Sequence, residues 1–221
     1  MEKRRVAATA TRARILEATR QLLAEQGTSD LSMDAIARRA DVARLTIYYQ
    51  FKSRRGLLEA LYDYLAMRGN MQRMAEVFHA PDPEQAIERL VRTFVGFWSS
   101  DPLVMRRLRA MASLDGEVEQ GIRARDARRQ HASREILRRM SAAAGASQVV
   151  SDKTTTAAAN LLSALTSFET YDALAVAGHS QDEIIGMITT LAKSAVTTPA
   201  ESVPLRAQAK TPVRRRPGRK R

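Results

Sequence analysis

The stretch Asp41-Val42-Ala43-Arg44-Leu45-Thr46-Ile47-Tyr48-Tyr49-Gln50-Phe51 decides how the rest of the chain is interpreted. It interleaves apolar residues, which can face a core, with polar and aromatic residues that can face outward. The core set is Val42, Ile47 and Phe51, with Leu45 in part. Aspartate tolerates the left-handed conformation that a tight turn commonly requires. We therefore interpret the stretch as the turn and second helix of a helix-turn-helix, with Asp41 at the turn.

Two further helices are predicted before this stretch. Apolar and small residues recur at helical spacing from about Thr9, with Thr9 or Thr11 as a plausible cap, and Gly27 ends that helix. Ser32 can cap a second, short helix. The apolar side of the second helix holds Met33, Ile36, Ala37 and Ala40. A helix, a tight turn and a second helix, with small Ala37 allowing close approach, is the geometry of a helix-turn-helix.

The residues after the stretch predict only helices. Ser53 can cap a fourth helix that reaches about Met74, and the two prolines of residues 79–83 form a loop. Further helices are expected over roughly 83–98, 103–111, 117–144, 152–177 and 181–196. The predicted fold is all-α. It consists of a three-helix head and a larger helical body, with about nine helices in total.

Composition indicates an ordinary globular chain of one large domain or two small ones. It has 221 residues, of which 44% are hydrophobic and 27% are charged, and it has no cysteine. The absence of cysteine excludes disulfides and thiolate nucleophiles and fits a reducing compartment. No apolar run approaches the roughly 18 residues that span a bilayer, and Lys3-Arg4-Arg5 is not followed by a secretory apolar stretch. A cytoplasmic protein without a membrane partner is expected.

The net charge of +12 is concentrated at the two ends of the chain. Residues 1–14 hold five basic residues and one acidic residue, and residues 201–221 hold eight basic residues and one acidic residue. A basic head and tail on a near-neutral body suggest a polyanionic partner. Two solvated ends that aid solubility are the alternative. Predicted segments are a flexible basic arm (1–8), a helix-turn-helix domain (9–55), a larger helical domain (56–198) and a disordered basic tail (199–221).

Residues 31–58 resemble the TetR family of transcriptional repressors. The resemblance is carried, in order, by Leu31-Ser32, Ile36-Ala37, Ala40-Asp41-Val42-Ala43, Thr46-Ile47-Tyr48-Tyr49, Phe51-Lys52-Ser53 and Leu57-Leu58. Three positions depart from the family pattern. Asp41 stands where glycine is usual, Ala43 replaces a common serine so that one cap is lost, and Arg55-Gly56 replaces a pair that often contains glutamate, which is expected to loosen the start of the fourth helix.

The resemblance implies a sequence-specific regulator whose recognition helix enters the major groove of double-stranded DNA. Arg44 is the candidate for reading guanine, whereas Thr46 and Lys52 are expected to bind phosphate, and Lys3, Arg4 and Arg5 to reach a minor groove or do nothing specific. For Arg44 the alternative is contact with phosphate alone. Tyr48 and Tyr49 are expected to contact DNA, and the alternative for either is packing on the first helix. The full set of predicted DNA-binding residues is Ser32, Arg44, Leu45, Thr46, Tyr48, Tyr49, Gln50 and Lys52.

The resemblance also implies a homodimeric repressor of a palindromic operator, with residues 56–198 as its ligand-binding and dimerisation domain. The expected dimer surface is the last two body helices, roughly 155–177 and 182–196, where Ala157, Ala158, Ala159, Ala164, Ala192 and Ala195 allow close packing. Regulation is expected from an unidentified small apolar effector, with no cofactor or metal. Candidate pocket residues are Phe94, Trp98, Met105, Met111, Phe168 and Tyr171, with Phe97 beside them and with Glu169, Asp172 and His131 as polar additions. Ordinary core packing is the alternative for each.

Other classes of function have less support in the sequence. The three histidines lack metal-ligand spacing, and neither a glycine-rich phosphate loop nor a nucleophile elbow is present, so an enzyme is not expected. The stronger rival is an architectural protein that coats DNA through both basic ends without reading its sequence. The cationic tail from Arg214 to Arg221 is expected to add non-specific, salt-dependent DNA affinity, and an inert tail is the alternative.

Overall fold

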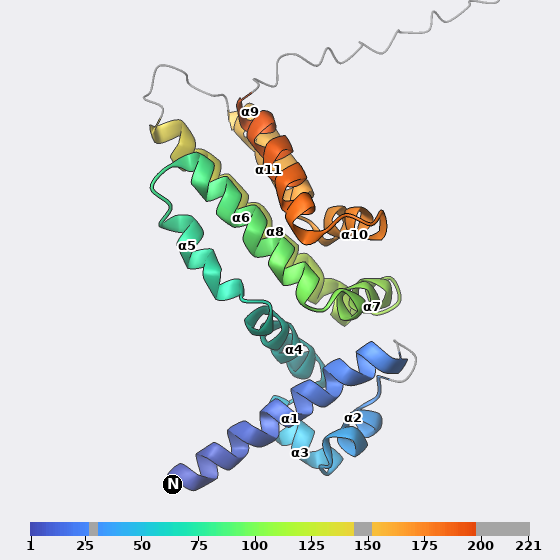
Figure 1. The fold of residues 1–221 in the computed structure, drawn as a ribbon. Helices are drawn as coiled ribbons and strands as arrows, with labels where there is room; N and C mark the ends of the chain where they lie inside the picture. The colour runs from blue at the N-terminus through green and yellow to red at the C-terminus, as the bar shows by residue number, and fades with distance from the viewer. Residues whose placement is uncertain (27–30, 144–151, 198–221) are drawn as a thin grey trace, which may run out of the picture.

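The computed structural model describes residues 1–26, 31–143 and 152–197, and the fold within these ranges is entirely helical (Figure 1). The all-α prediction is therefore confirmed. These ranges contain eleven α-helices and one 3-10 helix, where about nine helices were expected. The larger number arises because two of the expected helices are interrupted.

The head consists of α1 (Glu2–Gln26), α2 (Met33–Ala40) and α3 (Arg44–Phe51). Ser32 caps α2 as predicted, since its Oγ accepts a hydrogen bond from the Ala35 amide at 3.1 Å. Asp41 adopts the predicted left-handed conformation, with φ of 50° and ψ of 57°. Ala43 precedes α3 without a side-chain cap, also as predicted. Buried residues from all three helices form the head's core, among them Ile15, Leu23, Ile36, Ile47 and Phe51.

The first helix begins much earlier than expected. Residues 2–8 were predicted to be a flexible arm, but they form the first turns of α1, and Thr9 lies inside the helix with its Oγ1 donating to the Arg5 carbonyl at 3.1 Å. The reason is local. Residues 2–8 contain no glycine or proline and consist mostly of good helix formers, and Glu2 in the first turn favours the helix dipole and approaches Arg5 at 3.6 Å.

The fourth helix is shorter than expected. Helix α4 spans Arg54–Arg68 instead of reaching Met74, and it is followed by a 3-10 turn, η1 (Met71–Arg73), and by α5 (Met74–Phe78). Asn70 takes the left-handed conformation at φ of 56°, which ends the helix. Gly69 lies so close to α6 that a Cβ atom there would come within 2.4 Å of the Phe97 ring. Packing against Phe97 therefore imposes a break that the apolar periodicity did not reveal.

The body is built from the remaining helices, and α6 and α8 are long neighbours at its centre (Figure 1). Pro83 occupies the first turn of α6, where the helix was expected to begin, and Asp82 caps the helix by accepting from the Gln85 amide at 2.9 Å. The body helices are α6 (Pro83–Ser100), α7 (Pro102–Ala112), α8 (Gly116–Ala143), α9 (Asp152–Leu165), α10 (Phe168–Val176) and α11 (Gln181–Thr197).

The helix expected over 152–177 is in fact two helices, α9 and α10. The chain turns at Thr166 and Ser167. Ser167 caps α10 by accepting from the Thr170 amide at 3.2 Å, and the Thr166 carbonyl accepts a hydrogen bond from the Trp98 indole at 3.1 Å. Because α6 supplies the partner for a carbonyl that the helix has released, the break is a tertiary feature. The expected helix end at Gly145 and the tail 199–221 lie outside the described residues.

A polar network joins the head to the body. Glu17 and Arg20 of α1 form an ion pair at 2.7 Å, and Arg20 also bonds Asp101, at the junction of α6 and α7, at 2.7 Å. From α4, the Tyr64 hydroxyl donates to Glu17 at 2.7 Å. Bonds from Arg20 and Tyr64 lower the pKa of Glu17 to about 2, although partial burial opposes the shift. Helices α1 and α4 thus meet at the Glu17 carboxylate, and Arg20 links this pair to Asp101.

Gly56 is required by close packing and does not loosen the start of α4, contrary to expectation. A Cβ atom at this position would lie 2.0 Å from the backbone oxygen of Phe51. The Gly56 amide completes the Ser53 cap at 3.0 Å, so the turn between α3 and α4 is both tight and capped. This turn fixes how α3 meets α4.

Within the described residues, no helix is long and apolar enough to cross a membrane.

We predict that Gly56→Ala lowers the free energy of unfolding by about 1–3 kcal/mol, because its Cβ clashes with backbone that cannot rotate away. The control is Gly96→Ala in the middle of α6, where a Cβ atom meets nothing within 4 Å. The control is expected to be neutral or to stabilise by up to about 1 kcal/mol, since alanine is the better helix former. Urea unfolding followed by circular dichroism compares them. Equal effects would contradict the packing argument.

We also predict that Glu17→Gln destabilises the protein at pH 7 by about 1 kcal/mol, because it removes a charged acceptor from Arg20 and Tyr64. The folded-state pKa of Glu17, about 2, lies below its ordinary value of 4.5. The stabilisation is therefore complete above pH 4.5 and fades as the pH falls toward 2. Urea titrations at pH 7 and pH 3 are expected to show a smaller difference between variant and wild type at pH 3. Glu119→Gln, at an exposed ion pair within α8, is the control and is expected to change stability by only a few tenths of a kcal/mol.

Candidate nucleic-acid interface and ligand cavity

Helix α3 presents an outward face that is separate from its buried face. Ile47 is fully buried and Phe51 is 4% exposed, whereas Leu45 is 78% exposed and Tyr49 is 76% exposed. Leu45 was expected to face the core in part. Leu45 does not face the core, because the core-facing residues of this two-turn helix are four positions apart, as Ile47 and Phe51 are. Leu45 therefore stands beside Arg44 and Tyr49 on the free surface.

Arg44 begins α3 and is held by a neighbouring helix. Its Nη1 lies 3.2 Å from Oδ2 of Asp34 on α2, and its guanidinium lies 5.8 Å from the centre of the Tyr48 ring. Both side chains of the ion pair are more than half exposed. An exposed pair of this kind contributes about 0–1 kcal/mol, so Arg44 can exchange Asp34 for another partner at little cost.

The two tyrosines differ in their surroundings. Tyr48 is half-buried and packs against the head's core, while Tyr49 is exposed and carries the Lys52 ammonium 5.3 Å from its ring centre. Lys52 follows α3 with φ of 68°, which places it at the sharp turn before α4. The structure therefore brings Tyr49 and Lys52 together on the surface and gives Tyr48 a mainly packing environment.

The other predicted DNA-binding residues are tied to the head in different ways. Ser32 is exposed and already caps α2. Thr46 is half-buried, and its hydroxyl has no partner among the described residues. The Gln50 amide lies 3.5 Å from the Ala8 carbonyl, and the Gln50 carbonyl accepts from Arg12 Nη1 at 2.9 Å.

Sequence reasoning missed Arg12, which connects α1 to the end of α3. Its guanidinium stacks 4.2 Å from the Phe51 ring centre while it bonds the Gln50 carbonyl. Arg12 thereby provides a cation at the C-terminal end of the recognition helix, where the helix dipole favours positive charge. The signal in the sequence was weak, because one arginine in a basic segment does not identify its partner.

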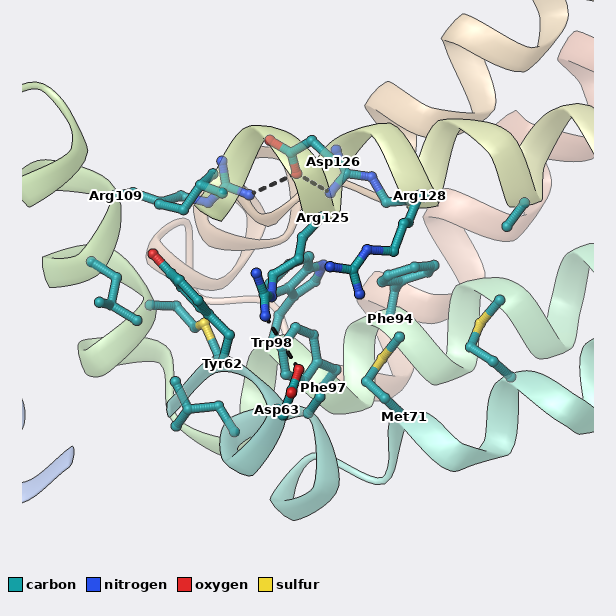
Figure 2. Close-up of a pocket in the computed structure, with 18 residues that line it drawn as sticks. Tyr62, Asp63, Met71, Phe94, Phe97, Trp98, Arg109, Arg125, Asp126 and Arg128 are labelled. Carbon is teal, nitrogen blue, oxygen red and sulfur yellow. Dashed lines mark hydrogen bonds and ion pairs between the residues drawn. The ribbon is translucent and has the colours of Figure 1, made fainter. Parts of the chain in front are cut away.

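A cavity of about 300 Å³ lies in the body, between α4, α6, α7 and α8 (Figure 2). Its apolar wall comes from α6 and its neighbours and includes Met71, Met74, Phe94, Phe97, Trp98, Met105 and Leu108. Helix α4 contributes Tyr62, Asp63, Leu65 and Ala66. The polar wall contains Arg109, Arg125, Asp126, Arg128 and Arg129.

Half of the expected pocket residues line this cavity. Phe94, Trp98 and Met105 do so, as does Phe97. Met111, Phe168 and Tyr171 do not, because each is buried in the core. Phe168, for example, packs edge-on against the far side of Trp98 with ring centres 5.6 Å apart. Among the polar additions, Glu169 pairs with Arg109 and Asp172 with Arg106, and His131 is exposed away from the lining.

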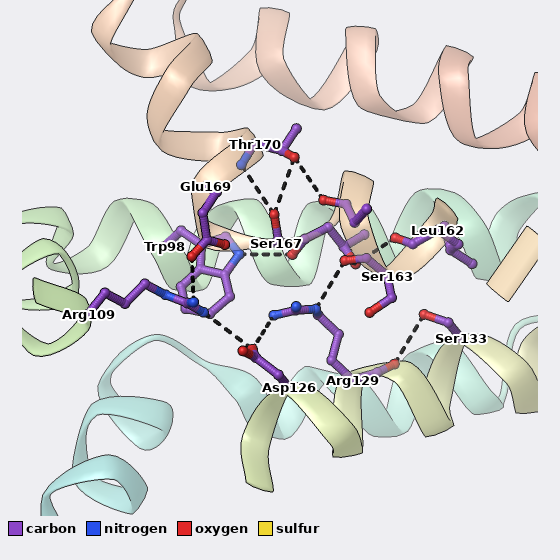
Figure 3. A network of polar contacts seen from close by, with 12 residues as sticks. Trp98, Arg109, Asp126, Arg129, Ser133, Leu162, Ser163, Ser167, Glu169 and Thr170 are labelled. Atoms are coloured by element: carbon purple, nitrogen blue, oxygen red, sulfur yellow. Dashed lines mark hydrogen bonds and ion pairs between the residues drawn. The ribbon is translucent and has the colours of Figure 1, made fainter. Parts of the chain in front are cut away.

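The polar wall belongs to a network that crosses the body (Figure 3). Asp126 accepts from Arg129 at 2.9 Å and from Arg109 at 3.3 Å. Arg129 also donates from Nε to the Ser163 carbonyl at 3.2 Å, which ties α8 to α9. The sequence showed an arginine-rich helix with a polar middle, but an ordinary solvated face would give the same pattern.

Two groups in this cavity have shifted pKa values. Burial lowers the pKa of Arg129, and the nearby Arg109 charge adds to that shift while Asp126 opposes it. Burial raises the pKa of Tyr62 to about 12, although the Arg125 charge partly offsets it. The Tyr62 hydroxyl donates to the Val118 carbonyl at 3.2 Å, so this tyrosine joins α4 to α8 and remains neutral.

The part of the chain that the structure describes contains no candidate metal site. No group of three or more histidine, cysteine, aspartate or glutamate side chains there is arranged to hold a metal ion.

Comparison with known proteins agrees with the geometry of the head. Residues 15–61 match the family model described as bacterial regulatory proteins of the tetR family. The HTH-type transcriptional regulator EthR of Mycolicibacterium smegmatis is 32% identical over 95 residues, which cover 42% of this chain and 44% of the relative. The HTH-type transcriptional regulator SrpR of Pseudomonas putida is 41% identical over 72 residues, covering 33% of this chain and 31% of the relative. The chain thus spans less than half the length of the curated relatives it matches.

The body is similar to solved structures in fold. The crystal structure of a TetR-family transcriptional regulator from a Rhodococcus species superposes with a TM-score of 0.65 at 19% identity, and the match covers 86% of this chain and all of the other. A likeness at this level of identity bears on the fold alone. The likeness in fold thus reaches beyond the head and covers 86% of this chain.

Proposed function

Because the chain carries the helix-turn-helix domain of the TetR family, we propose that the protein is a homodimeric transcriptional regulator. It binds a palindromic operator as a repressor and is released by a small molecule. The observation that carries this proposal is the outward face of α3, where Arg44, Tyr49 and Lys52 are free of the core while Ile47 and Phe51 anchor the helix.

The α3 face has the chemistry needed to read DNA. An α-helix fits the major groove, and its N-terminal residues meet the base edges. Arg44, at the first position of α3, presents a fork that matches the O6 and N7 atoms of guanine. The exposed ion pair with Asp34 holds the side chain over this face until a base replaces the carboxylate. Thr46 and Lys52 are placed to bind phosphate, which fixes the register of the helix.

Dimerisation through α9 and α11 is supported by apolar residues that the chain itself leaves uncovered. Leu161 is 47% exposed on α9, and Met187 and Leu191 are 39% and 55% exposed on α11. Helices α9 and α11 lie side by side (Figure 1), so these residues can belong to one surface. Ala159 and Ala192 do not contribute, because both are fully buried in the core of their own chain.

Helix α4 provides a route from the cavity to the head. Leu57 and Leu58 are buried near its start, where α4 packs on α1 and α3, whereas Tyr62, Asp63 and Leu65 line the cavity. The start of α4 is also clamped to the body, since Arg54 bonds Asp115 at 2.5 Å and Glu117 at 2.9 Å. A molecule that displaces Tyr62 therefore shifts the helix that holds α3. The dimer then has two conformations that differ in the spacing of its two heads, and the molecule shifts the balance between them.

DNase protection on DNA upstream of the protein's own gene tests the proposal. A sharp, two-fold symmetric footprint supports the regulator. Graded protection that ignores sequence would instead favour an architectural protein that coats DNA.

We predict separate effects for the two charged residues at the ends of α3. Arg44→Ala is expected to weaken the free energy of operator binding by about 1–3 kcal/mol and to relax the base preference at one base pair in each half-site. Lys52→Ala is expected to weaken binding to all DNA sequences. It is also expected to reduce the slope of log affinity against log salt concentration by about one per head. Fluorescence anisotropy across a salt series measures both. Arg123→Ala, exposed on α8, removes the same charge far from the head and should leave affinity unchanged; an equal loss there would mean that net charge alone drives binding.

We also predict that Leu191→Glu disrupts the dimer, because it places a charge in an apolar interface. Sedimentation is expected to change from about twice the chain mass of 24.6 kDa to the chain mass itself. Operator affinity should fall with dimerisation while the helical content stays the same. Leu114→Glu is the control, since Leu114 is 88% exposed before α8 and away from α9 and α11. A Leu191→Glu protein that remains dimeric would place the interface elsewhere.

A further inference from the structure

The cavity between α4, α6, α7 and α8 has two walls of opposite character (Figure 2). One wall is aromatic and methionine-rich, with the rings of Phe97 and Trp98 only 4.5 Å apart at their centres. The other wall holds four arginines against two aspartates, Asp63 and Asp126. Such a lining suits a molecule with an apolar body and one polar end, because apolar surface supplies affinity and a few polar groups set orientation.

The acidic partners do not satisfy all of these arginines. Asp126 is shared between Arg109 and Arg129, and Arg109 takes its second partner, Glu169, from outside the lining. Both terminal nitrogens of Arg125 are engaged, by Glu59 and Asp63 and by backbone carbonyls. Arg128 has no hydrogen bond or ion pair with any other described residue, although it lines the cavity and reaches toward the aromatic cluster (Figure 2).

Arg129 adds a second donor that lacks an acceptor. It is 8% exposed, and its Nε and Nη1 bond Ser163 and Asp126. Its Nη2 has no acceptor among the described residues and is not sealed from solvent, since Thr189 Oγ1 is the one fully buried side-chain polar atom among them without a partner. Burial and the charge of Arg109 both disfavour this cation and lower its pKa. A buried charge whose donors are incompletely paired is costly, and an anion beside it relieves both the desolvation and the repulsion.

We propose that the cavity binds an amphipathic carboxylate, with its apolar body on Phe97 and Trp98 and its carboxylate between Arg128 and Arg129. Arginine suits this role because its planar fork can bind a carboxylate with two parallel hydrogen bonds. The volume of about 300 Å³ fits a small molecule. This inference rests on the proposed function only in treating this cavity as the effector site.

The test uses the full-length protein and Trp98, which is the only tryptophan of the chain and lies in the cavity wall. Octanoate is the probe, because its eight-carbon chain is apolar and its carboxylate is charged at pH 7. The comparison ligands are 1-octanol and octyltrimethylammonium, which keep the alkyl chain and change the charge. Titration is followed by Trp98 fluorescence, and thermal unfolding is recorded in parallel.

Octanoate is expected to change Trp98 fluorescence saturably and to raise the unfolding temperature, at concentrations at least tenfold lower than either comparison ligand requires. Equal binding of octanol would show that the site selects only for apolar character. Tighter binding of octyltrimethylammonium would show that it selects cations. Either result, or the absence of any saturable response to octanoate, overturns the proposal.

Variants separate the arginine contact from general effects. Arg128→Gln is expected to weaken octanoate binding by about threefold to tenfold without loss of stability, because the side chain is exposed and makes no hydrogen bond or ion pair with another described residue. Arg123→Gln on the same helix is the matched control and should bind as wild type. Arg129→Lys keeps the charge but not the fork, and it is expected to weaken binding while circular dichroism shows that the fold is retained. Unchanged affinity in Arg128→Gln and Arg129→Lys would exclude the proposed carboxylate position.

Failure of this proposal is distinguishable from failure of the proposed function. If octanoate binds with the expected charge preference but leaves operator affinity unchanged, the ligand class stands and the link from cavity to head is wrong. If the protein makes a sharp operator footprint but prefers an uncharged or cationic ligand, the regulator stands and the ligand class is wrong.

Discussion

The structure depends on the burial of α4 against two partners at once. Leu57, Leu58, Leu61 and Leu65 are all at most 4% exposed along one 15-residue helix. The first of these complete the core of the head, and the last reaches the cavity of the body. Each fully buried leucine contributes about 1.5–3 kcal/mol, so the head cannot tilt freely on the body without exposing some of this surface. In the function we propose, the same packing that stabilises the chain also couples the position of the head to the cavity.

Polar contacts determine which arrangement of that packing is adopted. Glu17, Arg20 and Tyr64 connect α1 and α4 to Asp101, and Arg54 connects the start of α4 to the start of α8. These contacts are directional, whereas apolar burial is not. They lie on both sides of α4 and define its angle. A shift of α4 has to break or exchange them, which makes them candidates for setting the balance between two head positions.

The head and the body place their charges in different ways. On α3 the charged residues are exposed and only lightly engaged, so that Arg44 can leave Asp34 for a new partner. In the body, Arg129 is buried and its pairing is incomplete, so that it favours an incoming anion over rearrangement of its neighbours. Exposed charge suits a surface that binds a polyanion through many weak contacts. Buried charge suits a cavity that selects one small ligand.

The sequence by itself determined the helix-turn-helix, because caps, turn residues and apolar spacing are local: Ser32, Asp41 and Ser53 act within four residues of their own positions. Local rules did not predict the break at Gly69, which the Phe97 ring imposes, or the turn at Thr166, whose carbonyl accepts a hydrogen bond from the Trp98 indole of α6. The residues of the cavity were likewise predicted only in part. Phe94 and Trp98 were identified from one apolar stripe, but Phe168 proved to be core and Arg128 and Arg129 were missed. An arginine in a helix looks the same in sequence whether it faces water or a cavity, and only tertiary packing decides which.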